Sequence, residues 1–400
     1  MNEEERIKGL SNPILLSLVI IGLIEPQAML HMAGTNHGIW AIIHWGLTVI
    51  NVLSFVTSIM LAFYMVKRKR DIFVPVLFVL LSLILFCNIS NGIYYSALFL
   101  YVMNVWTVVF FFRYFLNVGK LYNFVKVFEF WLYFFSVINV LTQIFYPQGL
   151  YVDDRGWAMF FYGNPNAFVY QYFMCLLMSC LSNLMSYGKL KFRFYLLIAL
   201  FVYSEFLGES STSIFAILVF VVLTVIFRDR VFSRVKAGNL SLSVSAVSSY
   251  IIISMGVNST FANMIEYFFH KDTTFSFRTE IWIVAIKSLQ NHSLIGLGWS
   301  YVPVGWRWNV GQCHNMFLDL FFIGGIFLFV TFMALCFMCI KHLDIDGKSI
   351  SQNIFLFVFI GYCIVFLMEA RRNDLGFYLL LAMMYYSRQI HDQYLMESNN

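Results

Sequence analysis

Charged residues are scarce in this chain. Asp, Glu, Lys and Arg make up 12% of its 400 residues, whereas a soluble domain carries about 25%. Apolar residues make up 60%, and so few charges cannot keep that much apolar surface in water. The composition excludes a cytosolic enzyme, a secreted disulfide scaffold, a nucleic-acid-binding protein and a disordered chain. The apolar residues form long unbroken runs, which also argues against an outer-membrane barrel.

Several chemical motifs are missing as well. The sequence has no Gly-rich phosphate loop with Lys-Ser/Thr, no dinucleotide fingerprint, no His-Glu-x-x-His and no metal-type spacing of Cys and His. Five of the seven cysteines lie inside apolar runs, so we expect no disulfide framework. These absences predict a protein without metal, nucleotide or other cofactor.

The apolar runs predict a polytopic all-α membrane protein that forms a single integral membrane domain over residues 1–400. A transmembrane helix needs about 20 apolar residues, so the composition supports about twelve spans. We place them near residues 13–30, 39–66, 72–87, 97–112, 127–145, 167–187, 194–208, 213–227, 239–257, 314–340, 350–368 and 375–387. The first run lacks a small-x-small cleavage pattern, so we read it as an uncleaved span.

The positions of Lys and Arg predict the orientation. With the N-terminus in the cytoplasm, 19 of the 26 cations fall on inner segments and seven on outer segments. This split favours twelve spans with both termini cytoplasmic. Two outer segments are long, residues 146–166 and residues 258–313, and we expect the second to act as a lid over an active site.

A helix is predicted inside the second outer segment, over Ser276–Gln290. The Ser276 hydroxyl can cap its first turn. Four of its residues recur at helical spacing and share one face: Arg278, Trp282, Ala285 and Leu289. The pattern resembles an interfacial helix that lies on the membrane with Trp and Arg at headgroup depth.

Outer arginines are the first candidate site residues. The positive-inside bias disfavours Arg155, Arg278 and Arg307 at their expected outer positions, which suggests a functional reason for them. The guanidinium fork matches phosphate oxygens and would suit a diphosphate-bearing lipid. The alternative is that Arg278 binds ordinary lipid phosphates or pairs with Glu280.

A histidine at the mouth of a predicted span is the second candidate. His314 precedes Asn315, and Asp319 follows four residues later on the same helix face, about 6 Å deeper. An ionisable group at membrane depth is a functional candidate, and a His there could act as a general base. The alternative is a His that only caps its helix at the water boundary.

Acidic residues near span ends form the third group. Glu205 and Glu209 are four residues apart and share a helix face, so they could form a carboxylate site or simply meet water. Glu369, next to Arg371 and Arg372, is interpreted as part of an ion cluster at the outer boundary.

About half of the chain resembles the O-antigen polymerase and ligase family of bacterial envelope proteins. The resemblance rests on Arg278 with Trp282, and on a series of short motifs in a constant order: Gly296-Leu297-Gly298, His314-Asn315, Gly324-Gly325 and the earlier turn Gly163-Asn164-Pro165-Asn166. There are departures. Ser293 stands near a position where members often carry Pro, and the stretch 208–213 lacks the Arg of a Ser-Arg pair that many members, ligases especially, carry.

The resemblance implies a metal-independent glycosyltransferase of the bacterial cytoplasmic (inner) membrane. Its donor would be a polyprenyl-diphosphate-linked oligosaccharide, and its partners the bilayer, a chain-length regulator and a flippase, with no nucleic acid. The missing Ser-Arg pair favours a polymerase of capsule, O-antigen or exopolysaccharide repeat units over a ligase; the alternative is that Arg155 or Arg307 takes the place of the missing Arg. A flippase or transporter of lipid-linked oligosaccharides is a rival of another class.

The resemblance also implies roles for particular residues. We assign catalysis to His314 as general base, with Asp319 or Glu209 as alternatives, and to Arg278, which would stabilise the departing diphosphate. The residues assigned to substrate binding are Arg155, Arg307, Trp282, Asn315 and Glu209.

Overall fold

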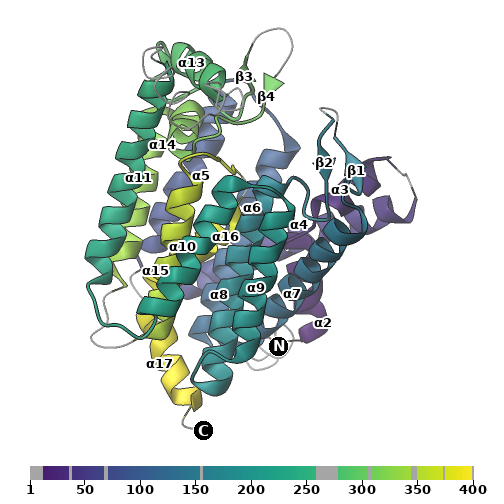
Figure 1. The fold of residues 1–400 in the computed structure, drawn as a ribbon, viewed down its shortest axis with the longest axis vertical. Helices are drawn as coiled ribbons and strands as arrows, with labels where there is room; N and C mark the ends of the chain where they lie inside the picture. Colours follow the sequence, from purple (N-terminus) through teal and green to yellow (C-terminus); the bar gives the residue numbers. More distant parts are fainter. Residues whose placement is uncertain are drawn as a thin grey trace.

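The protein is a bundle of long helices with two small hairpins outside it (Figure 1). The computed structural model describes residues 12–35, 38–66, 71–153, 156–257, 278–304, 309–343, 349–372 and 374–398. Helix α13, Arg278–Leu289, and the hairpin of β3, Val302–Pro303, with β4, Asn309–Val310, lie at one end of the bundle. The C-terminal helix α17, Ser387–Ser398, lies at the opposite end.

Before the first hairpin, the described chain forms six helices. They are α2 (Pro13–Leu23), α3 (Gln27–Thr35), α4 (Ile39–Val66), α5 (Phe73–Ser90), α6 (Ser96–Asn117) and α7 (Leu121–Phe145). The hairpin of β1 (Tyr151–Val152) and β2 (Ala158–Met159) follows, and then the 3-10 turn η1 (Pro165–Ala167).

The remaining helices of the bundle continue from η1. They are α8 (Phe168–Tyr187), α9 (Phe192–Leu207), α10 (Ser211–Phe227), α11 (Arg234–Val257), α14 (Met316–Lys341), α15 (Ile350–Val365) and α16 (Leu375–Tyr385). Among the seven helices long enough to cross a membrane, α8 and α6 are the most enclosed, with 94% and 78% of their apolar stretch buried. Helices α4 and α11 have only 17% and 22% buried, so their apolar faces are free to meet lipid.

Each predicted span contains a helix, and the fold class of an all-α polytopic membrane protein agrees with the structure. Among the described residues, seven helices are long and apolar enough to cross a membrane, and α10, α15 and α16 are shorter apolar helices. The count of twelve spans and the cytoplasmic termini stay predictions.

The first predicted span differs from the prediction because it is broken. Helices α2 and α3 meet at an angle of 77°. Pro26 lies at the break, where it removes a backbone donor and disfavours a helical conformation at Glu25. The Glu25 carboxylate accepts a hydrogen bond from His44 Nδ1 of α4 at 3.1 Å, so the break carries a polar contact between helices.

The predicted helix of the second outer segment is present as α13, while Ser276 lies outside the described residues. Trp282 is fully buried, although we expected it at headgroup depth. It packs in a small cluster of apolar side chains between α11, α13, α14 and β3. The face that carries Trp282 is therefore covered by protein, and the interfacial position of α13 stays a prediction.

Candidate active site

Glu369 is the centre of a polar cluster between α15 and α16. Its carboxylate accepts hydrogen bonds from Arg278 Nη2 at the start of α13, from His314 Nδ1 at 3.0 Å and from Asn166 Nδ2 at 3.2 Å. The Glu369 residue is only 4% exposed. A buried carboxylate needs such partners, because an isolated buried charge costs several kcal/mol. Four segments of the chain thus meet at one carboxylate.

Two of the side chains that bind Glu369 keep an accessible edge. The side chains of Arg278 and His314 are 19% and 17% exposed. His314 Nδ1 faces the carboxylate, and within the described part of the chain Nε2 has no hydrogen-bond partner. Such a ring, held by a carboxylate at one nitrogen and open at the other, has the arrangement of a general base.

The backbone around His314 is fixed by the segment that carries Glu369. His314 has a φ of 48°, which is uncommon for a residue other than Gly. Asn315 caps α14 through Oδ1, which accepts from Leu318 N at 3.0 Å, and its Nδ2 donates to Leu367 O at 3.0 Å. Asn315 therefore holds the turn of His314 in place, while its assignment to substrate binding stays a prediction.

A second buried ion pair lies beside the first. Asp319 accepts from Arg372 Nε and Nη2, both at 2.8 Å, in a bidentate pair. Asp319 Oδ1 also accepts from Cys313 N at 2.8 Å, and Arg372 Nη1 donates to Ser300 O at 3.1 Å. The pair thus connects both ends of the segment 300–313, and Asp319 is 1% exposed.

Trp282 extends this second network. Its Nε1 donates to Cys313 O at 3.0 Å, while Cys313 N donates to Asp319. The indole is a packing and hydrogen-bonding support beneath the site, and its complete burial leaves no face for a sugar.

The loop with Gly296-Leu297-Gly298 contacts α14 at its Gly324-Gly325 pair. Leu297 N donates to Phe322 O at 2.7 Å and Gly298 N to Ile323 O at 2.9 Å, so the loop binds α14 at its kink. A Cβ on Gly296 would lie 2.6 Å from the backbone of the Gly324 region, and one on Gly325 2.3 Å from the backbone of Leu294. Both glycines also have positive φ. Only Gly permits this contact.

Of the remaining candidates, the structure describes only Glu209, which is not among the hydrogen-bond partners of Glu369. Arg155 and Arg307 lie outside the described residues. Glu209 is exposed, with a φ of 54°, in the turn between α9 and α10. This turn approaches η1, because a Cβ on Gly208 would lie 3.0 Å from Pro165 Cβ. Glu205, one helical turn earlier, is buried and its carboxylate has no hydrogen-bond partner among the described residues.

Sequence reasoning missed the central position of Glu369. The partners lie 55, 91 and 203 residues away from it, so no local spacing reveals them. The available signal was the run Glu369-Ala370-Arg371-Arg372 directly after an apolar span. Arg371 supports the same region, since its Nη1 donates to Ala167 O at 2.8 Å. Among the described residues no three His, Cys, Asp or Glu side chains are placed to hold a metal ion.

Fold and site together define a multi-pass membrane protein with a buried carboxylate, imidazole and guanidinium cluster at one end. Residues 195–333 match the family model of the O-antigen ligases, so the family resemblance seen in the sequence is confirmed. No curated protein and no solved structure matches the chain. The matched region contains Arg278, His314 and Asp319, whereas Glu369 and Arg372 follow it. Members of this family transfer glycans from lipid-linked donors, and the match supports a role in polysaccharide assembly.

Proposed function

We propose that this chain is a polymerase of polyprenyl-diphosphate-linked oligosaccharide repeat units, acting on the outer face of the bacterial cytoplasmic membrane. The observation that carries the proposal is the single carboxylate of Glu369, which holds His314 and Arg278 side by side. A base and a guanidinium are the two groups that this transfer needs.

The proposed reaction needs no further reactant. His314 Nε2 takes the proton of the acceptor sugar hydroxyl, and the hydroxyl oxygen attacks the anomeric carbon of the donor. The bond from that carbon to the diphosphate oxygen breaks, and its electron pair leaves with the polyprenyl diphosphate. Arg278 stabilises the negative charge that gathers on the diphosphate. Glu369 orients the imidazole and stabilises the imidazolium that forms.

The remaining candidates take supporting roles in this proposal. Asp319 positions His314 through Cys313, because both of its oxygens already bind Arg372. Arg155, Arg307 and Glu209 stay proposed contacts for the diphosphate or the glycan. The donor's diphosphate already activates the sugar, so the proposed reaction uses no metal and no nucleotide.

Analysis of lipid-linked glycans in a strain that lacks the gene tests the function. A polymerase mutant keeps single repeat units on the outer face and loses long chains. Single units trapped inside would instead indicate a flippase. Long lipid-linked chains that never reach their final acceptor would indicate a ligase, the alternative that the family description favours.

Complementation of the same strain tests the site. We expect His314→Ala and Arg278→Ala to abolish polymer at normal protein levels. His292→Ala and Lys287→Ala are matched controls, because both residues are exposed on the same outer segment. Normal polymer from both site variants would refute the assignment.

A further inference from the structure

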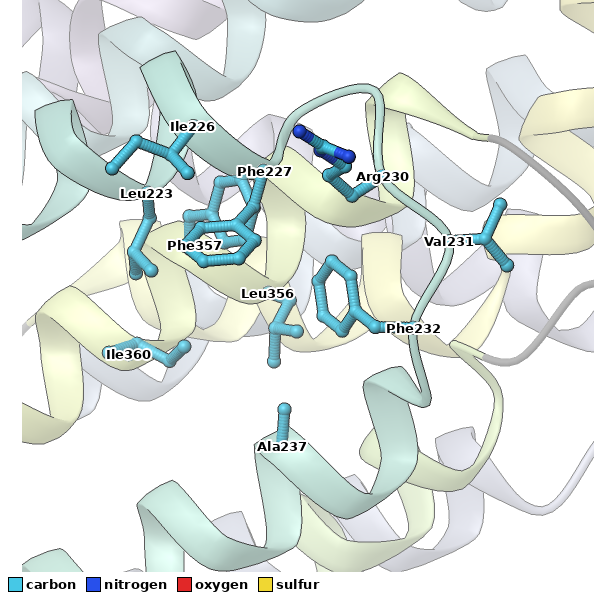
Figure 2. Close-up of a pocket in the computed structure, with 10 residues that line it drawn as sticks. All are labelled: Leu223, Ile226, Phe227, Arg230, Val231, Phe232, Ala237, Leu356, Phe357 and Ile360. Carbon is cyan, nitrogen blue, oxygen red and sulfur yellow. The ribbon is translucent and has the colours of Figure 1, made fainter.

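A groove lies at the other end of the bundle from Glu369. Helix α10 starts at the turn that adjoins Pro165 and runs for 17 residues, which is about 25 Å. At its far end, α10, α11 and α15 border a groove of about 510 Å³. Figure 2 shows the rings of Phe227, Phe232 and Phe357 grouped in it. This volume lies within the range of about 300–1,000 Å³ that proteins use for small ligands.

The groove has an apolar floor and an open side. Leu356 and Phe357 of α15 are buried at its base, and Phe232 stacks on Phe357 with ring centroids 6.3 Å apart. Ile226 and Val231 at its edge are 52% and 61% exposed. Side chains of this kind beside a membrane favour a hydrocarbon chain as the occupant.

The rim of the groove is positively charged. Arg230 lines the groove, is exposed and has no side-chain partner within the described part of the chain (Figure 2). Arg228 pairs with Asp229 at 3.0 Å, and Lys236 is exposed in the first turn of α11. The only acidic side chain from residue 228 to residue 236 is therefore occupied, and Arg230 is free to bind an anion.

We propose that this groove binds an anionic phospholipid, with one acyl chain against α10, α11 and α15 and the phosphate on Arg230. An apolar floor next to an unpaired guanidinium matches the two halves of such a lipid. Basic pockets between transmembrane helices bind anionic headgroups in this manner. The proposal does not depend on glycan transfer.

Native mass spectrometry of the full chain in detergent tests the headgroup contact. Phosphatidylglycerol and phosphatidylcholine with identical acyl chains are titrated separately. We expect phosphatidylglycerol to bind about fivefold more tightly, the effect of one cation near a headgroup. Arg230→Gln should remove this preference. Lys189→Gln should keep it, since Lys189 is exposed at the same end, beside the start of α9, but does not line the groove.

Equal binding of the two lipids by the wild type would overturn the proposal, and so would an unchanged preference in Arg230→Gln. An equal loss in Lys189→Gln would also overturn it, because diffuse surface charge would then explain the preference.

The acyl-chain contact has its own test. A phosphatidylglycerol with a photoreactive group in its acyl chain should label peptides that contain residues 223–232 or 356–360. Ala237→Phe, which narrows the groove, should lower this labelling. Labelling outside the groove, or labelling of the groove that Ala237→Phe leaves unchanged, would overturn the placement of the chain.

Discussion

Replacing Glu369 by Gln keeps the shape of the side chain and removes its charge. The carboxylate accepts from Arg278, His314 and Asn166. An amide offers one accepting oxygen and one donating NH2 group, so at least one of these donors would face another donor. Hydrogen bonds to charged groups contribute about 1.5–3 kcal/mol each. Loss of one such bond from the transition state lowers the rate about 10- to 150-fold.

The assay is glycan transfer by purified protein with a lipid-linked repeat unit, followed as kcat and kcat/KM. Both should fall equally in Glu369→Gln, because the lost bond acts in the transition state. Glu280→Gln is the matched control, since Glu280 is an exposed carboxylate in the first turn of α13. Activity of Glu369→Gln within about twofold of wild type, at equal folded protein, would refute the reasoning.

Three further predictions concern the stability of the folded protein. Asp319→Asn leaves Arg372 buried without its counter-ion and should lower the free energy of unfolding by about 3–5 kcal/mol. Chemical denaturation in detergent measures this change, and an unchanged midpoint of the denaturation curve would contradict the prediction. Gly325→Ala should lower the Tm strongly, because a Cβ there would lie 2.3 Å from the backbone of Leu294. Gly34→Ala is the control and should leave the Tm unchanged, because Gly34 has open space around it. Similar Tm values for both variants would count against the role of the glycine contact. Burial raises the pKa of the Asp374 carboxyl to about 6, so the folded state holds a proton that the unfolded state loses near pH 4. Stability therefore falls as pH rises from about 4 to about 6, and a Tm difference from Asp374→Asn that is constant over this range would disprove the shift.

The sequence was informative about helices and less so about their contacts. Long apolar runs predicted the bundle helices, because membrane insertion selects for length and hydrophobicity, which are local properties. The break at Pro26 was a local signal that a hydropathy reading overlooks. The glycine motifs around Gly296 and Gly325 pointed to the correct region, but their mutual contact is visible only once the loop lies on α14.

The site could be predicted only in part, because its contacts also join segments that are distant in the sequence. Arg278 and His314 were candidates because each is unusual at its place in the chain, and the structure brings both to one carboxylate. The role of Glu369 could not be read from its neighbours, since its partners come from distant segments. The burial of Trp282 could not be predicted, because an indole suits an interfacial belt and a buried core equally well, and only packing decides between them.

The stoichiometry of transfer by the purified protein tests the central claim most directly. A single lipid-linked repeat unit is supplied as both donor and acceptor, and released polyprenyl diphosphate and glycan length are measured by mass spectrometry. We predict one polyprenyl diphosphate released for each unit added to a lipid-linked chain by the wild type, and none by His314→Ala. Absence of chain growth with the wild type, or equal growth with His314→Ala, would contradict the account.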